Sequence, residues 1–288
     1  IGPTDHMGDV VGDRPFGEHA FQQQLEIAIR WLDHVVKGED NGIADEPPIT
    51  FFTMGVNQWR TANTWPPENA VLTNFYLRSS HGSRHGSLNT ELPIDDPPSE
   101  YTYDPDNPVP TLGGNHSGPQ DHPEIIRVGV LDNRSNWDRE DVLVFETDTL
   151  QSNIEVTGPI TATVFASTSA KDTDFIVRLL DIDPDGTAWN LTEGIIRSRF
   201  RNGIYDPPEL LEPGEVFKYE IELLPTSNIF LEGHKIAIHI TSSNFPMYDR
   251  NPNTGHRQGM DSLIEIAYQT IFHDAEQPSY VTLPIVDS

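Results

Sequence analysis

The chain has 288 residues, no cysteine and a formal net charge of −27 at pH 7, from 45 acidic against 18 basic residues. The lack of cysteine excludes disulfides, thiolate catalysis and Cys-ligated zinc, and so acidic a surface repels nucleic acid and anionic membranes. No apolar run approaches the ~20 residues of a membrane span, and no signal peptide is recognisable. The composition predicts a soluble acidic protein, cytoplasmic or secreted; a surface adapted to high salt is the alternative that it leaves open.

The first residues, "IGPTDH", are typical of a buried strand that ends in a Gly2-Pro3 turn and presents Asp5 and His6. A chain that begins in the middle of such a motif is expected to be a fragment or a processed product. A histidine on this turn is a candidate general base, because its near-neutral pKa lets it take up and return a proton. The alternative is a loop histidine without function.

Residues 17–37, "GEHAFQQQLEIAIRWLDHVVK", predict the one long helix. Apolar side chains recur every three to four residues, at Phe21, Leu25, Ala28, Leu32 and Val35 or Val36. Ile29 and Trp31 widen this stripe, which indicates burial on more than one side. Lys37 in the last turn and Gly38 after it predict the end of the helix.

Beyond Pro48 the pattern changes to short β-rich runs separated by turns. The runs are "ITFFTMGV", "NAVLTNFYLR", "DVLVFET", "IEVTGPITATVFAS", "DFIVRLLDI", "VFKYEIELL", "HKIAIHITS" and "SYVTLPIV". Many short strands without crossover helices predict an antiparallel sandwich or jelly roll. Residues 79–124 are expected to form an extended surface excursion. The predicted organisation is therefore a remnant of an α/β layer over residues 1–48 and a complete β domain over residues 49–288.

The layout of residues 1–37 fits the end of an α/β-hydrolase domain, where the triad order is Ser, acid, His and one helix follows the histidine. No serine lies in a G-x-S-x-G context; the nearest match, Ser117, has Asn115 where glycine is required. The nucleophile and the acid are therefore expected N-terminal to Ile1, in the same precursor or in a partner chain. Asp5 is rejected as the acid, because consecutive turn residues point their side chains apart.

Three further groups are weighed as sites. Asp181, Asp183, Asp185 and Gly186 resemble the start of a calcium loop, but Thr192 stands where the bidentate Glu is needed, so a Pro-Asp-Gly turn between strands is preferred. A zinc site is not favoured for the loop histidines, His81, His85, His116 and His122. Pairing with surface carboxylates is favoured over anion binding for the alternating arginines, Arg197, Arg199 and Arg201. No metal or cofactor is expected.

The run "DTDFIVRLLD" places Asp172, Asp174 and Arg178 on one strand face and Phe175 on the other. The Phe175 face is expected to be core. The charged face is expected to be solvated or packed against a neighbouring domain, with Arg178 paired to a carboxylate.

Several segments together resemble the cocaine-esterase-like (CocE/NonD) serine hydrolases, which include glutaryl-cephalosporin acylases and α-amino-acid ester hydrolases and share their C-terminal domain with X-prolyl dipeptidyl-peptidases. They include "IGPTDHMG", "RWLDHVVKGEDNGI", "TMGVNQWRTANTWPP", "YDPDNPVPTLGGNHSGPQDH", "DTDFIVRLLDIDPDG", "SSNFPMYDRNPNTG" and "HDAEQPSYVTLPIV", in the order of that family. The match spans nearly the whole chain. Thr4 stands where the family usually has Trp, which leaves the substrate preference open.

This resemblance implies the last loop and helix of an α/β-hydrolase core followed by a galactose-binding-like jelly roll. It implies hydrolysis of a small ester or amide by acyl transfer, with His6 as the triad histidine and the N-terminal hydrolase and cap segment as the partner; homo-oligomerisation is left open. The alternative is a non-catalytic β-sandwich module for binding or assembly. An exposed row of aromatic residues on one sheet would favour a carbohydrate-binding module.

Overall fold

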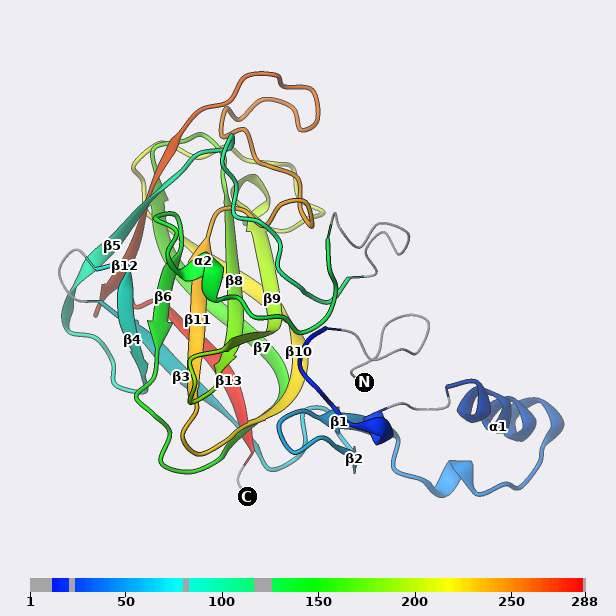
Figure 1. The fold of residues 1–288 in the computed structure, drawn as a ribbon. Helices are drawn as coiled ribbons and strands as arrows, with labels where there is room; N and C mark the ends of the chain where they lie inside the picture. Colours follow the sequence, from blue (N-terminus) through cyan, green and yellow to red (C-terminus); the bar gives the residue numbers. More distant parts are fainter. Residues whose placement is uncertain (1–11, 21–23, 80–82, 117–125, 287–288) are drawn as a thin grey trace.

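The computed structural model describes residues 12–20, 24–79, 83–116 and 126–286. These residues form a β-sandwich with one longer helix beside it (Figure 1). The helical elements are η1 (Glu18–Ala20), α1 (Gln24–Lys37), η2 (Ile43–Asp45), α2 (Arg134–Trp137) and η3 (Ser198–Phe200). The strands are β1 (Ile49–Thr53), β2 (Gln58–Ala62), β3 (Ala70–Arg78), β4 (His85–Asn89), β5 (Asp95–Tyr103), β6 (Leu143–Glu146), β7 (Ile154–Thr168), β8 (Asp174–Ile182), β9 (Ala188–Arg197), β10 (Phe217–Phe230), β11 (Lys235–Thr241), β12 (Ala267–Asp274) and β13 (Tyr280–Val286).

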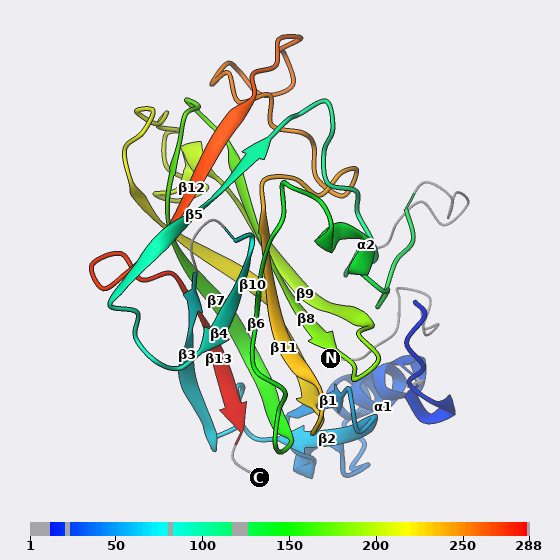
Figure 2. The same cartoon turned by 60° about the vertical axis from the view of Figure 1, so that its left-hand side comes forward.

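The main sheet folds over into two facing layers. Its hydrogen-bonded order is β5-β12-β7-β13-β3-β4-β6-β11-β8-β9, with β10 paired to β7. The layer with β6, β11, β8 and β9 faces the layer with β13, β7 and β10 (Figures 1 and 2). Among the described strands every pair is antiparallel except β4–β6, whose long connection permits a parallel pair. The prediction of a mainly-β sandwich is confirmed, with this pair as the departure from a purely antiparallel sheet.

The core lies between these layers and follows the period-two pattern of the strands. On β10 the side chains of Tyr219, Ile221 and Leu223 are buried, and the charged residues between them are exposed. The Phe175 ring of β8 lies 4.8 Å from the Tyr219 ring of β10, centroid to centroid, so residues from facing strands meet in one core. The expectation that the Phe175 face is core is confirmed.

The opposite face of β8 differs from what the sequence predicts. Every residue of β8 is buried, and the side chain of Arg178 pairs with the carboxylate of Glu193 on β9. Asn133, from one loop of the chain, accepts from Arg178, and Asn244, from another, donates to its partner Glu193. The pairing of Arg178 is confirmed, whereas both a solvated face and a face packed against another domain are wrong, since loops far away in sequence cover the strand.

The described part of the stretch from 79 to 124, residues 79 and 83–116, is also not only a surface excursion. It contains β4 and β5, and β5 pairs with β12 at the edge of the sheet. Pro97 and Pro98 lie within β5, where prolines are tolerated because an edge strand leaves one row of hydrogen-bonding groups unpaired. Hydrophobic alternation did not reveal this strand, because it begins with two consecutive aspartates and two prolines.

Residues 18–20 form the separate 3-10 turn η1 rather than α-helix, and the described part of the predicted helix is α1. It ends as predicted: the amide of Gly38, whose φ is +73°, donates to the carbonyl of His34 at 3.0 Å. The apolar stripe is not buried by this chain, because Leu25 and Val36 are each 74% exposed and Leu32 is 54% exposed. Figure 1 shows why: α1 stands away from the sandwich, beyond the small β1–β2 sheet. Within the described residues, no helix has the length and apolar character needed to cross a membrane.

Candidate active-site segment

The predicted triad histidine, His6, lies outside the described residues, together with Thr4 and Asp5. Residues 12–16, here called the strap, are the part of the segment after His6 that the structure describes. The strap carries Asp13, Arg14 and Phe16 and ends beside η1. Its contacts define how the segment that bears His6 is tied to the β-sandwich.

The strap pairs through its backbone with the loop that precedes α2. Gly12 forms a parallel bridge with Val130, and the Asp13 amide donates to the Val130 carbonyl at 2.8 Å. Gly12 has a φ of +100°, and a Cβ there would lie 2.5 Å from the Val130 backbone. This position therefore requires glycine, both for its conformation and for the close approach of the two chains.

The side chain of Phe16 fixes the apolar end of the strap. It is 2% exposed and packs in a small cluster with Phe52, Val130 and Ala20. The rings of Phe16 and Phe52 meet edge to face at 6.0 Å. Phe52 belongs to β1 and Val130 to the loop before α2, so this cluster joins the strap to two parts of the chain beyond the predicted domain boundary at residue 48.

Arg14 carries the polar end of the strap into a buried charge cluster. Its Nη2 lies 2.7 Å from Oδ2 of Asp181 at the end of β8, and the two side chains are 10% and 0% exposed. Nδ1 of His234, from the turn between β10 and β11, lies 2.8 Å from the other oxygen of Asp181. The hydrogen bond to Asp181 raises the pKa of His234, so this imidazole favours its charged form. An arginine and a histidine therefore share one buried carboxylate.

The same cluster includes Asp183 and could offer three ligand atoms to a metal ion, those of Asp181, Asp183 and His234. However, Trp189 Nε1 donates to Asp183 at 2.8 Å, and Arg14 and His234 occupy both oxygens of Asp181. A divalent cation would have to displace Arg14 and compete with its charge. The donor set fits an arginine–imidazole pair on a carboxylate better than a metal centre.

The turn between β8 and β9 confirms the preferred interpretation of residues 181–186. The Gly186 amide donates to the Asp183 carbonyl at 2.8 Å, and the Asp183 amide to the Thr187 carbonyl at 2.9 Å. Gly186 has a φ of +86°, as a tight turn between two strands requires. The aspartates do not form a calcium loop there.

Buried polar side chains support the loop that receives the strap. Asn190 Oδ1 accepts from the Leu131 amide at 2.7 Å, and its Nδ2 donates to the Gly129 carbonyl at 3.2 Å. Asn133 Oδ1 in turn accepts from Arg178 Nη1 at 2.9 Å. Side chains of β8 and β9 thus fix the loop before α2 through hydrogen bonds, and the backbone of that loop binds the strap.

The predicted histidine and arginine sites are not assembled. His81 and His122 lie outside the described residues, His85 is exposed on β4, and His116 lies beside Gly114; neither of the latter two joins a group of metal ligands in the described part of the chain. Each arginine of the alternating run is paired, Arg197 with Asp174, Arg199 with Asp172 and Arg201 with Glu209. Carboxylate pairing is confirmed, although two of the partners, Asp172 and Asp174, are buried rather than on the surface.

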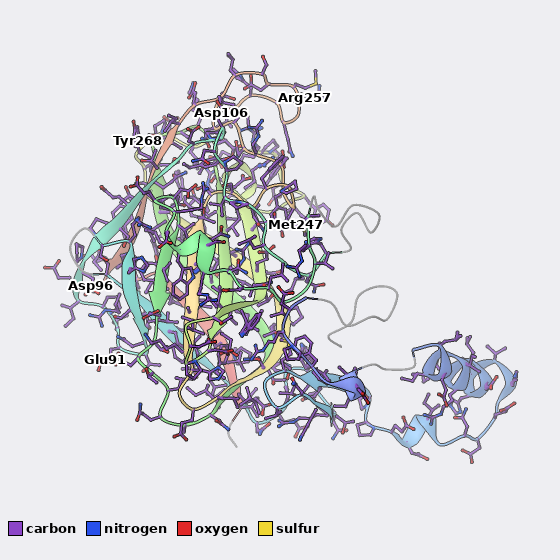
Figure 3. The ribbon with its side chains drawn as sticks, in the orientation of Figure 1. Glu91, Asp96, Asp106, Met247, Arg257 and Tyr268 are labelled. Carbon is purple, nitrogen blue, oxygen red and sulfur yellow. The ribbon has the colours of Figure 1, made fainter. Side chains whose placement is uncertain are left out.

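A pocket of about 280 Å³ lies at the end of the sandwich remote from α1. Its walls include Phe245, Arg250, His256 and Ile264 from the loop between β11 and β12. Asp106 and Arg257 mark this end of the molecule in Figure 3. The lining also includes Arg197 and Arg199, whose charges are already paired with Asp174 and Asp172.

Sequence reasoning did not identify Arg14 or His234, and it noted Asp181 only as part of a turn. Arg14 and Asp181 are 167 residues apart, so no local spacing signals their contact. The one available hint was an arginine and a phenylalanine close together between a predicted active-site turn and a predicted helix.

Comparisons with known proteins agree with this architecture. The family of X-Pro dipeptidyl-peptidase C-terminal non-catalytic domains matches residues 41–282. Cocaine esterase of Rhodococcus sp. (strain MB1 Bresler) is 38% identical over 301 residues, which cover 99% of this chain and 51% of that protein. An aminopeptidase from a marine sediment archaeon, Thaumarchaeota archaeon, superposes with a TM-score of 0.79 at 31% identity, over 92% of this chain and 44% of its own. An α-amino acid ester hydrolase superposes with a TM-score of 0.77 at 26% identity, over 93% of this chain and 46% of its own.

The chain thus corresponds to the C-terminal part of the hydrolases that it matches. It belongs to the family of X-Pro dipeptidyl-peptidase C-terminal non-catalytic domains, as found in CocE/NonD-type serine hydrolases. The chain spans about half the length of the cocaine esterase that it matches.

Proposed function

We propose that this chain is the C-terminal part of a serine hydrolase that cleaves a small ester or amide by acyl transfer, and that His6 is its general base. The exposed apolar face of α1 carries the proposal. Leu25, Leu32 and Val36 place apolar surface in water, at a cost of roughly 1.5–3 kcal/mol for each large side chain left unburied. A helix of this kind, directly after the segment with His6, is what the end of an α/β-hydrolase core would supply.

In the proposed mechanism a serine from the N-terminal core attacks the carbonyl carbon while His6 accepts the hydroxyl proton. The tetrahedral intermediate collapses, and His6 returns the proton to the leaving alcohol or amine. Water then attacks the acyl-enzyme, with His6 again accepting a proton and passing it to the serine. An acidic residue of the same core orients the imidazole. The β-sandwich contributes no reacting group in this scheme.

The test uses the longer polypeptide of which this chain is the C-terminal part. His6→Ala is expected to lower kcat on a p-nitrophenyl ester by several orders of magnitude, and Asp5→Asn by about 10-fold at most. Equal losses in the two variants would contradict the assignment of the acid to the N-terminal core. If His6→Ala kept most of the activity, the hydrolase role of this segment would be refuted.

A carbohydrate-binding module is the other candidate, and the described surface does not favour it. Among the large apolar side chains that are exposed in the described residues, Tyr268 on β12 is the one aromatic residue on a strand. Tyr205 and Phe245 lie in loops, and Trp31 lies on α1. A row of aromatic rings on one sheet, as a sugar-binding face would present, is not found in this part of the chain.

A further inference from the structure

We propose that Arg14 is a positioning residue: through its ion pair with Asp181 it fixes the segment that bears His6 on the β-sandwich. This inference rests on the proposed function of His6. Arg14 follows His6 by eight residues, and Gly12, the first described residue, by six. The strap is therefore the nearest described part of the chain to which that segment can be anchored.

The burial of the Arg14–Asp181 pair indicates that it fixes the position of the strap along the sandwich rather than adding to the stability of the chain. A buried ion pair is a weak stabiliser, because the loss of hydration offsets much of the attraction between the charges. Asp181 is fully buried and already contacts the His234 imidazole, so Arg14 is a second partner of one carboxylate. A leucine at position 14 could bury its side chain without this loss of hydration, but it would leave the strap free to shift along the loop.

The contacts on either side of Arg14 hold the strap in place next to the ion pair. The Asp13 amide donates to Val130 on one side of Arg14, and Phe16 packs against Phe52 on the other. These contacts hold the backbone of the strap close to the loop before α2. The Arg14–Asp181 pair connects the strap to β8, so it sets the position of the strap relative to the sheet as well as to the loop.

Arg127 supplies a matched control. Its guanidinium binds the carboxylate of Asp13 on the same strap, at 2.5 and 3.2 Å, but both side chains are at least half exposed. Removing this pair disturbs the same segment and removes the same number of charges. Because an exposed pair contributes little, a role in position predicts a large effect for Arg14 and a small one for Arg127.

The first measurement is hydrogen exchange of the Asp13 amide in this 288-residue chain, which is independent of catalysis. In Arg14→Gln the protection of this amide is expected to fall at least 10-fold, and in Arg127→Gln less than about 3-fold. Arg14→Lys should retain most of the protection. Equal effects in Arg14→Gln and Arg127→Gln would overturn the proposed anchoring, whatever the activity of the enzyme.

The second measurement is steady-state kinetics in the longer polypeptide. Arg14→Gln is expected to lower kcat at least 10-fold with KM within about 3-fold, and Arg14→Lys to recover part of it. The double variant Arg14→Gln/Asp181→Asn removes the buried carboxylate that has lost its arginine, and should regain stability while kcat stays low. If kcat recovered together with stability, Arg14 would be merely structural. If His6→Ala were fully active, the proposed function would fail instead, while the exchange result would still decide the anchoring.

Discussion

The guanidinium of Arg178 and the carboxylate of Glu193 lie 2.7 Å apart on adjacent strands, and both side chains are less than 10% exposed. Arg178 also donates to Asn133, and Asn244 donates to Glu193, so the pair links the sheet to the loops on both sides. Because the two charges compensate each other, this face of β8 can be buried, although its composition alone would place it in water.

Replacement of Arg178 with alanine should destabilise the chain by about 3–5 kcal/mol, because it leaves the Glu193 carboxylate buried without its partner. The double variant Arg178→Met/Glu193→Gln should cost clearly less, since no uncompensated charge remains. The free energy of unfolding in urea measures both. Arg127→Ala, which breaks an exposed pair, should cost no more than about 1 kcal/mol. A cost as small as this for Arg178→Ala would mean that the face is hydrated in solution.

The burial of His273 predicts that the folded chain loses stability in acid. It is fully buried on β12, its Nε2 lies 3.0 Å from Ser99 Oγ, and burial lowers its pKa to about 4. A folded-state pKa below the ordinary value of 6.5 means that the unfolded chain takes up the proton first. The contribution of His273 is therefore complete above pH 6.5 and is lost as the pH falls toward 4, with a slope of at most ~1.4 kcal/mol per pH unit.

His273→Gln should flatten this slope when urea unfolding is measured at several pH values between 7 and 4. His85→Gln, a change at an exposed position on β4, is the matched control and should leave the slope unchanged. An unchanged slope in His273→Gln would show that other groups carry the acid sensitivity. His239 is one such group, because burial lowers its pKa as well.

The exposed face of α1 predicts that substitutions on it destabilise the longer polypeptide but hardly affect the stability of this chain. Leu32→Gln should change the free energy of unfolding of this chain by only about 0.5 kcal/mol, because its side chain is 54% exposed. Leu179→Ala in the core, where the side chain is fully buried, should cost about 2–5 kcal/mol. In the longer polypeptide the combination of Leu25→Gln, Leu32→Gln and Val36→Gln should lower thermal stability by several degrees, because these side chains would there be buried. Full tolerance of the triple variant would mean that no hydrolase core covers α1.

The sequence by itself determined the elements whose pattern is local. Alternation in β7 and β10, the short β-rich runs of β8 and β11, and the Gly38 end of α1 all follow from residues within one element. The Pro-Asp-Gly turn at residues 184–186 is equally local. The order of motifs also indicated the family. The role of His6 stays a prediction, since the residue lies outside the described part of the chain.

Only the tertiary structure decided which charges are buried. Arg14 and Asp181 meet across 167 residues, and Arg178 meets Asn133 across 45, so neither contact has a signature in local spacing. The strand β5 was hidden for a related reason: its prolines and aspartates are acceptable because it lies at an edge, and the position of a strand in a sheet is a non-local property. Hydrophobic periodicity reports the burial of apolar side chains, whereas the burial of a charge depends on the partner that compensates it, and only the folded chain supplies that partner.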